Sequence, residues 1–104
     1  ANEMILRSFA HCQVPAESIN LTSPERYSVR TVADQLGKLM QRQPQLVGSE
    51  APTALLSNTK RMQEKLGKPQ VDLEQMLRWI AHWTVNDGPT LNKPTHFATR
   101  DGKY

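Results

Sequence analysis

Two histidine–aspartate pairs come nearest to a catalytic site in this sequence. His82 is followed by Asp87, and His96 is followed by Asp101 at the same interval. In each pair the imidazole could act as a general base that the carboxylate orients. Neither pair comes with a recognisable nucleophile, and a histidine beside two tryptophans, as His82 is, is more often packed than catalytic. The residue types therefore give little support for catalysis by this chain alone.

The remaining motifs argue against a metal or phosphate site. The sequence has no phosphate-cradling glycine loop, no zinc-binding motif and no cluster of carboxylates. His11 and Cys12 are adjacent, but no second cysteine or histidine stands at ligand spacing. Because Cys12 is the only cysteine, an internal disulfide framework is excluded, which suits the cytoplasm.

Length and composition fit one small domain that does not enter a membrane. The 104 residues are 38% hydrophobic, and their mean hydropathy is −0.60. No apolar run approaches the roughly 18 residues that a membrane helix needs, and the first residues lack the basic and apolar regions of a signal peptide. The chain begins without a methionine, so we expect residues 1–104 to be a single partial domain of a longer cytoplasmic protein.

The charge pattern does not favour a nucleic-acid partner. The formal net charge is +3 and the pI is about 9.3. A nucleic-acid-binding protein usually gathers its lysines and arginines into one stripe. Here they are spread through the predicted helices and mixed with acids, as expected of solvated helix faces.

The stretch from 18 to 37 is the element that would position a site. Residues 18–21 are predicted to form a short strand, which the turn at 22–25 ends because Pro24 presets a turn dihedral and removes a backbone donor. Ser28 is then a suitable N-cap for a helix with one apolar face, formed by Val29, Val32, Ala33, Leu36, Leu39 and Met40. Ligands of open α/β sheets usually lie at the carboxyl ends of such strands.

Further helices and short strands complete the predicted domain. A helix is expected over residues 2–12, and short strands are expected at 45–47 and 54–56. Ser57 should cap a helix that uses Met62 and Leu66 as apolar contacts and ends at Gly67. Asp72 should cap the longest helix, whose predicted buried face comprises Leu73, Met76, Leu77, Ile80, Trp83 and Thr84. Residues 89–104 form a predicted extended polar tail.

One alternative is a small DNA-binding or protein-interaction module. Residues 31–37, TVADQLG, have the Ala-x-x-x-Gly pattern of a helix-turn-helix. The apolar face continues past Gly37 without a break, however, and residues 43–48 are predicted to be extended and do not resemble a basic recognition helix.

Several motifs occur together, in order, in one known family. They are the strand and turn at 19–25 (INLTSPE), the helix start at 27–33 (YSVRTVA), and the runs 57–60 (SNTK), 65–69 (KLGKP) and 71–75 (VDLEQ). In this order the chain resembles the C-terminal part of an extended short-chain dehydrogenase/reductase, the NAD-dependent epimerase/dehydratase family. The resemblance implies an α/β fold, the C-terminal portion of a Rossmann-like enzyme, mainly helical with a few short strands.

The resemblance also implies a division of labour. The family's glycine-rich dinucleotide turn and its Tyr-x-x-x-Lys pair are absent from this chain, so NAD or NADP would be bound by an N-terminal part of the same enzyme. This chain would contribute substrate binding and structure without catalysing alone. The implied partners are that dinucleotide-binding part and a small, sugar-like substrate, and the resemblance is compatible with a homodimer of the complete enzyme.

Four residues follow as candidate substrate contacts. Many family members carry an arginine that grips a nucleotide-sugar pyrophosphate in the loop before the 57–60 motif, but here the loop reads GSEAPT. Glu50 would repel a pyrophosphate, and Thr53 could bond a polar group. The resemblance therefore implies a smaller or less anionic substrate, unless Arg26 or Arg30 has taken the role of the missing arginine.

Overall fold

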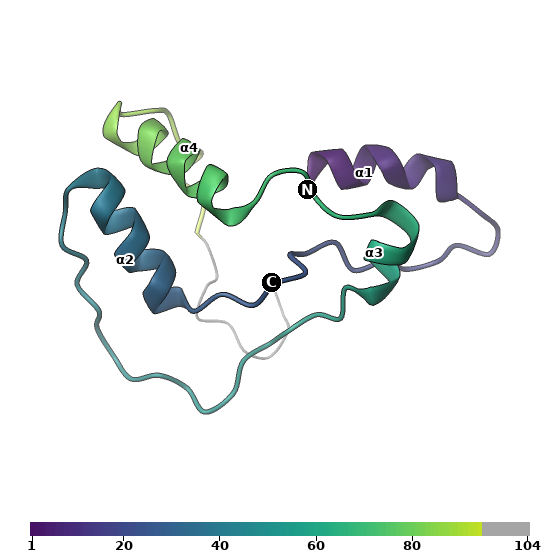
Figure 1. The fold of residues 1–104 in the computed structure, drawn as a ribbon, viewed down its shortest axis with the longest axis horizontal. Helices are drawn as coiled ribbons and strands as arrows, with labels where there is room; N and C mark the ends of the chain where they lie inside the picture. Colours follow the sequence, from purple (N-terminus) through teal and green to yellow (C-terminus); the bar gives the residue numbers. More distant parts are fainter. Residues whose placement is uncertain (95–104) are drawn as a thin grey trace.

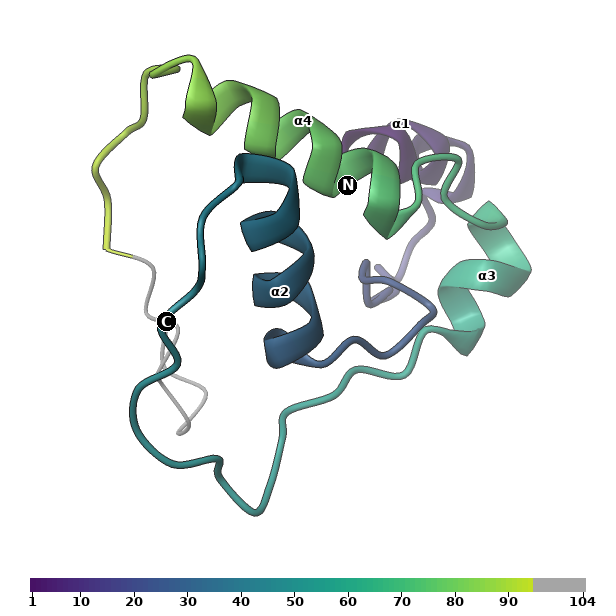
Figure 2. The same cartoon turned by 60° about the vertical axis from the view of Figure 1, so that its left-hand side comes forward.

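The computed structural model describes residues 1–94 as helices joined by extended segments. The helices are α1 (Asn2–Ser8), α2 (Val29–Met40), α3 (Lys60–Leu66) and α4 (Leu73–Val85), with the 3-10 helix η1 (Phe9–His11) directly after α1. Helix α2 packs beside α4, and α1 packs against α3 (Figure 1). Residues 41–59 run without regular structure from the end of α2 to α3 (Figure 2).

The predicted α/β fold is wrong. None of the residues from 1 to 94 forms a β-strand, and the segments at 18–21, 45–47 and 54–56 are irregular. A strand needs a neighbouring strand to accept its backbone hydrogen bonds. The segment at 18–21 is instead held by side chains: Asn20 Nδ2 donates to the Asn58 carbonyl at 3.3 Å, and Ile19 packs on a cluster of buried side chains.

Helix α2 begins after Ser28, as predicted, although the Ser28 side chain makes no capping hydrogen bond, and it ends at Met40 in a tight reversal. The Arg42 N–H donates to the Gly37 carbonyl at 2.9 Å, and the Gln41 N–H donates to the Lys38 carbonyl at 3.3 Å. Gln41 has a φ of 53°, the left-handed conformation that this C-terminal motif requires. A Cβ on Gly37 would lie 2.6 Å from the Arg42 carbonyl oxygen. Gly37 therefore permits the close approach of the chain that follows the helix.

Helices α3 and α4 confirm part of the predicted capping. Asp72 Oδ1 accepts the Gln75 N–H at 2.8 Å, as the sequence predicts. Helix α3 begins at Lys60 rather than directly after Ser57, because the Asn58 carboxamide oxygen accepts the Lys60 N–H at 2.9 Å. Gly67 follows α3 with a φ of 77°, a positive value that glycine accommodates most easily.

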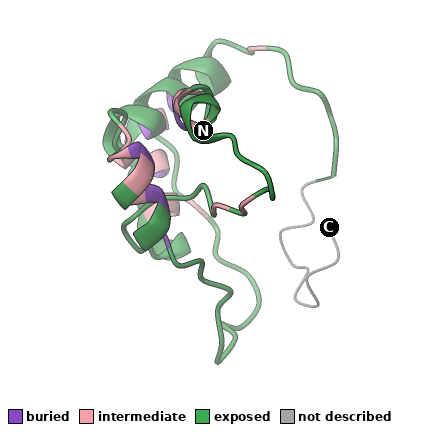
Figure 3. Ribbon diagram, turned by 90° about the vertical axis from the view of Figure 1, so that its right-hand side faces the viewer, coloured by how far each residue is buried: buried purple, intermediate pink, exposed green. Residues whose placement is uncertain are grey.

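Few side chains are buried. One cluster comprises Met4, Met62 and Leu66, with Ile19 packed against it. On α4 the buried residues are Leu77 and Ala81. The predicted face of α4 is therefore wrong in part, because Met76, Ile80 and Trp83 are exposed. Exposed residues predominate over the described chain (Figure 3). The predicted tail at 89–104 is irregular at 89–94, and its remainder lies outside the described residues.

Candidate substrate-contact site

Two of the four candidate substrate contacts meet in the structure. Arg30, in the first turn of α2, donates from Nη2 to Glu50 Oε1 at 2.7 Å and from Nε to the same oxygen at 3.2 Å. Both side chains are mostly exposed, at 57% for Arg30 and 78% for Glu50. The pair ties the loop at 48–53 to the start of α2.

The electrostatics of this pair bear on what it could bind. The hydrogen bond and the charge of Glu50 raise the pKa of the Arg30 guanidinium, and the nearby Asp34 adds to this effect. The guanidinium is thus already paired with one carboxylate and lies in the field of a second, which disfavours binding of an anionic ligand at this arginine. This arrangement could accept hydrogen bonds from the hydroxyls of a neutral, polar molecule.

The other two candidates are placed less closely. Arg26 is exposed in the irregular segment before α2. Thr53 is exposed and lies three residues beyond Glu50 in the same loop. The structure therefore brings Arg30 and Glu50 together as a unit, whereas Arg26 and Thr53 remain candidates by position only.

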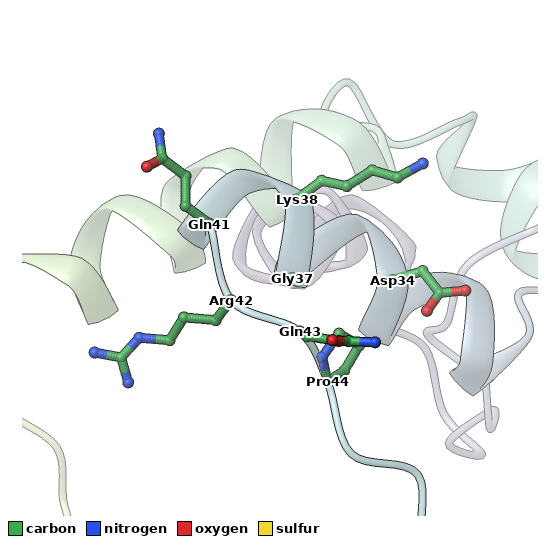
Figure 4. Close-up of a pocket in the computed structure, with 7 residues that line it drawn as sticks. All are labelled: Asp34, Gly37, Lys38, Gln41, Arg42, Gln43 and Pro44. Atoms are coloured by element: carbon green, nitrogen blue, oxygen red, sulfur yellow. The ribbon is translucent and has the colours of Figure 1, made fainter.

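A shallow depression of about 410 Å³ lies at the C-terminal end of α2, two turns from Arg30. Asp34, Gly37 and the reversal at 41–44 line it, and the Lys38 and Arg42 side chains extend from its rim in different directions (Figure 4). Because these charged ends diverge, they do not converge on one ligand atom. Neither Arg30 nor Glu50 lines this depression.

A second depression, of about 470 Å³, was not predicted from the sequence. It is lined by polar side chains from the 18–21 segment and the start of α3, namely Ser18, Asn20, Asn58, Lys60, Arg61 and Glu64. Arg61 Nη1 donates to the Ser18 carbonyl at 3.2 Å, and it also lies 3.2 Å from Glu17 Oε1. The Asn58-x-Lys60 spacing, which is typical of a side chain that accepts a nearby backbone N–H, was the available signal.

Glu17 fixes this second surface to α3. Its carboxylate forms ion pairs with Lys65 and Arg61, and its side chain is 22% exposed. The hydrogen bond from Lys65 lowers the pKa of the Glu17 carboxyl. The role of this cluster is to hold the segment before 18–21 against the helix.

Of the two histidine–aspartate pairs, the structure describes only His82 with Asp87, and it gives no support for that pair as a catalytic site. The His82 Nδ1 atom lies 3.3 Å from the carboxamide of Asn86 rather than against Asp87. His96 and Asp101 lie outside the described residues. Within residues 1–94 no group of three or more His, Cys, Asp or Glu side chains could hold a metal ion. Over the same residues no helix is long and apolar enough to cross a membrane.

Comparisons with protein-family models, with curated proteins and with solved structures find no match for this chain.

Proposed function

We propose that this chain is the substrate-binding and structural segment of an NAD(P)-dependent epimerase/dehydratase-like oxidoreductase. It does not catalyse alone, and it acts while docked on the polypeptide that binds the dinucleotide. The ordered motifs at 19–25, 27–33 and 57–75 support the choice of enzyme class. The described residues form helices only, unlike the α/β fold that the resemblance implies, so the proposal concerns function only.

The large exposed surface of the chain supports the proposal that it docks on another polypeptide. The chain exposes 9383 Å², whereas a compact monomer of 11.8 kDa exposes about 5,900 Å². The difference, roughly 3,500 Å² on this chain alone, is at least as large as the roughly 1,000–2,500 Å² that each partner contributes to a permanent interface. The Cα radius of gyration, 16.4 Å, likewise exceeds the value of about 13 Å typical of a compact domain of this length. A surface of this size favours a polypeptide partner over a small ligand alone.

The Arg30–Glu50 pair supports a polar substrate with little negative charge. Arg30 is paired with Glu50, so this arginine is less available to a pyrophosphate than an unpaired arginine would be. A sugar or another small polyol could instead donate hydrogen bonds from its hydroxyl groups to the Glu50 carboxylate.

A second candidate function is an independent protein-interaction module. The large exposed surface supports it equally, and it differs from the first candidate in requiring no dinucleotide. The helix-turn-helix alternative is less favoured, because α2 is followed by the irregular residues 41–59 and by no second helix at the distance of a recognition helix.

The Arg30–Glu50 pair gives the experiment that tests the substrate assignment. In the complete enzyme, Glu50→Gln should tighten binding of UDP, a diphosphate probe, by roughly tenfold or more, because one released charge-assisted hydrogen bond contributes about 1.5–3 kcal/mol. Glu64→Gln is the matched control, since it removes one exposed carboxylate on α3 that pairs only loosely with Lys60 at 3.9 Å. Isothermal titration calorimetry measures both variants. Equal UDP affinities in wild type and Glu50→Gln would remove this pair from the substrate site.

A further inference from the structure

Helix α4 carries an apolar surface that its neighbours leave exposed. We call it the tryptophan stripe and define it as Met76, Trp79, Ile80 and Trp83, which are 45%, 56%, 45% and 52% exposed. A helix advances about 100° per residue, so these four side chains occupy one arc of roughly 100°. Leu77 and Ala81, the buried residues of α4, occupy the adjoining arc. The stripe is therefore an additional apolar face beside the one that packs inside the chain.

One member of the stripe is held in a fixed orientation. Trp83 Nε1 donates to the Pro89 carbonyl at 3.1 Å. The backbone at Gly88 lies so close to the indole that a Cβ there would come within 2.3 Å of the ring. A ring held in this way loses little side-chain entropy when a partner covers it, which favours the use of this face for recognition.

The spacing of the stripe is the same when it is read in either direction. Met76, the Trp79–Ile80 pair and Trp83 are separated by three, one and three residues. A two-fold interface uses the same surface of both copies, so that a contact from residue i to residue j is matched by one from j to i, and this symmetric spacing is compatible with it. Around an axis between positions 79 and 80, Met76 would face Trp83 of the other copy, whereas Trp79 and Ile80, on opposite sides of the stripe, would each lie near the same residue of the other copy. Each Trp83 indole would then lie against a methionine, the two Trp79 indoles would lie near each other, and no charged residue belongs to the stripe.

We propose that two copies of this chain pair antiparallel through their α4 helices, with stripe against stripe. This self-association goes beyond the proposed function, because neither a dinucleotide nor a substrate is required for it. The four half-exposed side chains offer roughly 500 Å² per copy, or about 1,000 Å² in total, which is at the low end of specific interfaces. The dimer should therefore be weak and reversible, forming between about 10 μM and 1 mM.

The test is sedimentation velocity of the 104-residue chain over that concentration range. Wild type should shift from monomer to dimer, and Ile80→Arg should weaken the association at least tenfold, because two like charges would meet at the axis. Val85→Arg is the matched control, since Val85 is exposed on the same helix outside the stripe and the charge change is identical. This control should associate like wild type.

Cysteine trapping keeps the proposal testable if an arginine variant does not fold. In a Cys12→Ser background, Ile80→Cys should form a disulfide-linked dimer on mild oxidation, and Val85→Cys should form much less. A monomer at every concentration, an unchanged dimer in Ile80→Arg, or equal trapping at positions 80 and 85 would each overturn the proposal. The proposal would also be overturned if Ile80→Arg prevented the binding of a different polypeptide and left self-association intact.

Discussion

The replacement of Met62 by alanine is the perturbation that tests where the chain is stabilised. Met62 is 1% exposed and belongs to the cluster with Met4 and Leu66, against which Ile19 packs. Truncating a buried methionine removes its apolar contacts and leaves a cavity, a loss of about 2–5 kcal/mol. A domain of this length has a stability of about 5–15 kcal/mol, and this chain buries few apolar side chains. Met62→Ala should therefore remove a large part of the free energy of unfolding.

The matched comparison is Ile80→Ala in the tryptophan stripe. Ile80 is about half exposed, so its truncation should cost about 1 kcal/mol, half of the contribution of a fully buried isoleucine. Urea denaturation followed by circular dichroism gives both losses, at a chain concentration near 5 μM so that pairing of the stripe does not contribute. Equal losses in the two variants, or a larger loss for Ile80→Ala, would refute the assignment of the core to the α1–α3 cluster.

Two further predictions concern single contacts. Gly37→Ala should destabilise the chain by about 1–3 kcal/mol despite the better helix propensity of alanine, because its Cβ would meet the Arg42 carbonyl oxygen at 2.6 Å. Thermal denaturation measures this loss, and a raised Tm would contradict the prediction. The lowered pKa of Glu17, caused mainly by the hydrogen bond from Lys65, should contribute stability that is present above the unfolded-state pKa of about 4.3 and is lost as the pH falls through the lower folded-state value. The Tm advantage of wild type over Lys65→Met should accordingly shrink between about pH 5 and pH 3, and a constant difference would contradict that account.

Features that depend on neighbouring residues in the sequence could be predicted. The cap at Asp72, the start of α2 and the burial of Met62 and Leu66 follow from local hydrogen bonding and helical periodicity. Gly67 was likewise recognised as the residue after α3, because positive φ angles favour glycine.

Features that depend on distant partners could not be predicted. Residues 18–21 have the composition of a strand, but no described segment pairs with them. On α4 the apolar residues span two adjoining arcs, and periodicity alone cannot decide which arc faces α2; it is the arc of Leu77 and Ala81. Arg30 and Glu50 were both candidates, but their contact crosses twenty residues of chain, a distance over which the sequence carries no contact information.

The central claim is that this chain serves an NAD(P)-dependent enzyme without binding the dinucleotide itself. The most direct measurement is a fluorescence titration of NADH and NADPH against the 104-residue chain and, in parallel, against the complete natural polypeptide that contains it. We predict saturable binding to the complete polypeptide, with a Kd between about 1 μM and 1 mM, the range of typical enzyme KM values. The chain alone should show no saturable binding. A folded, complete polypeptide that binds neither NADH nor NADPH would contradict the account and leave the interaction module as the better explanation.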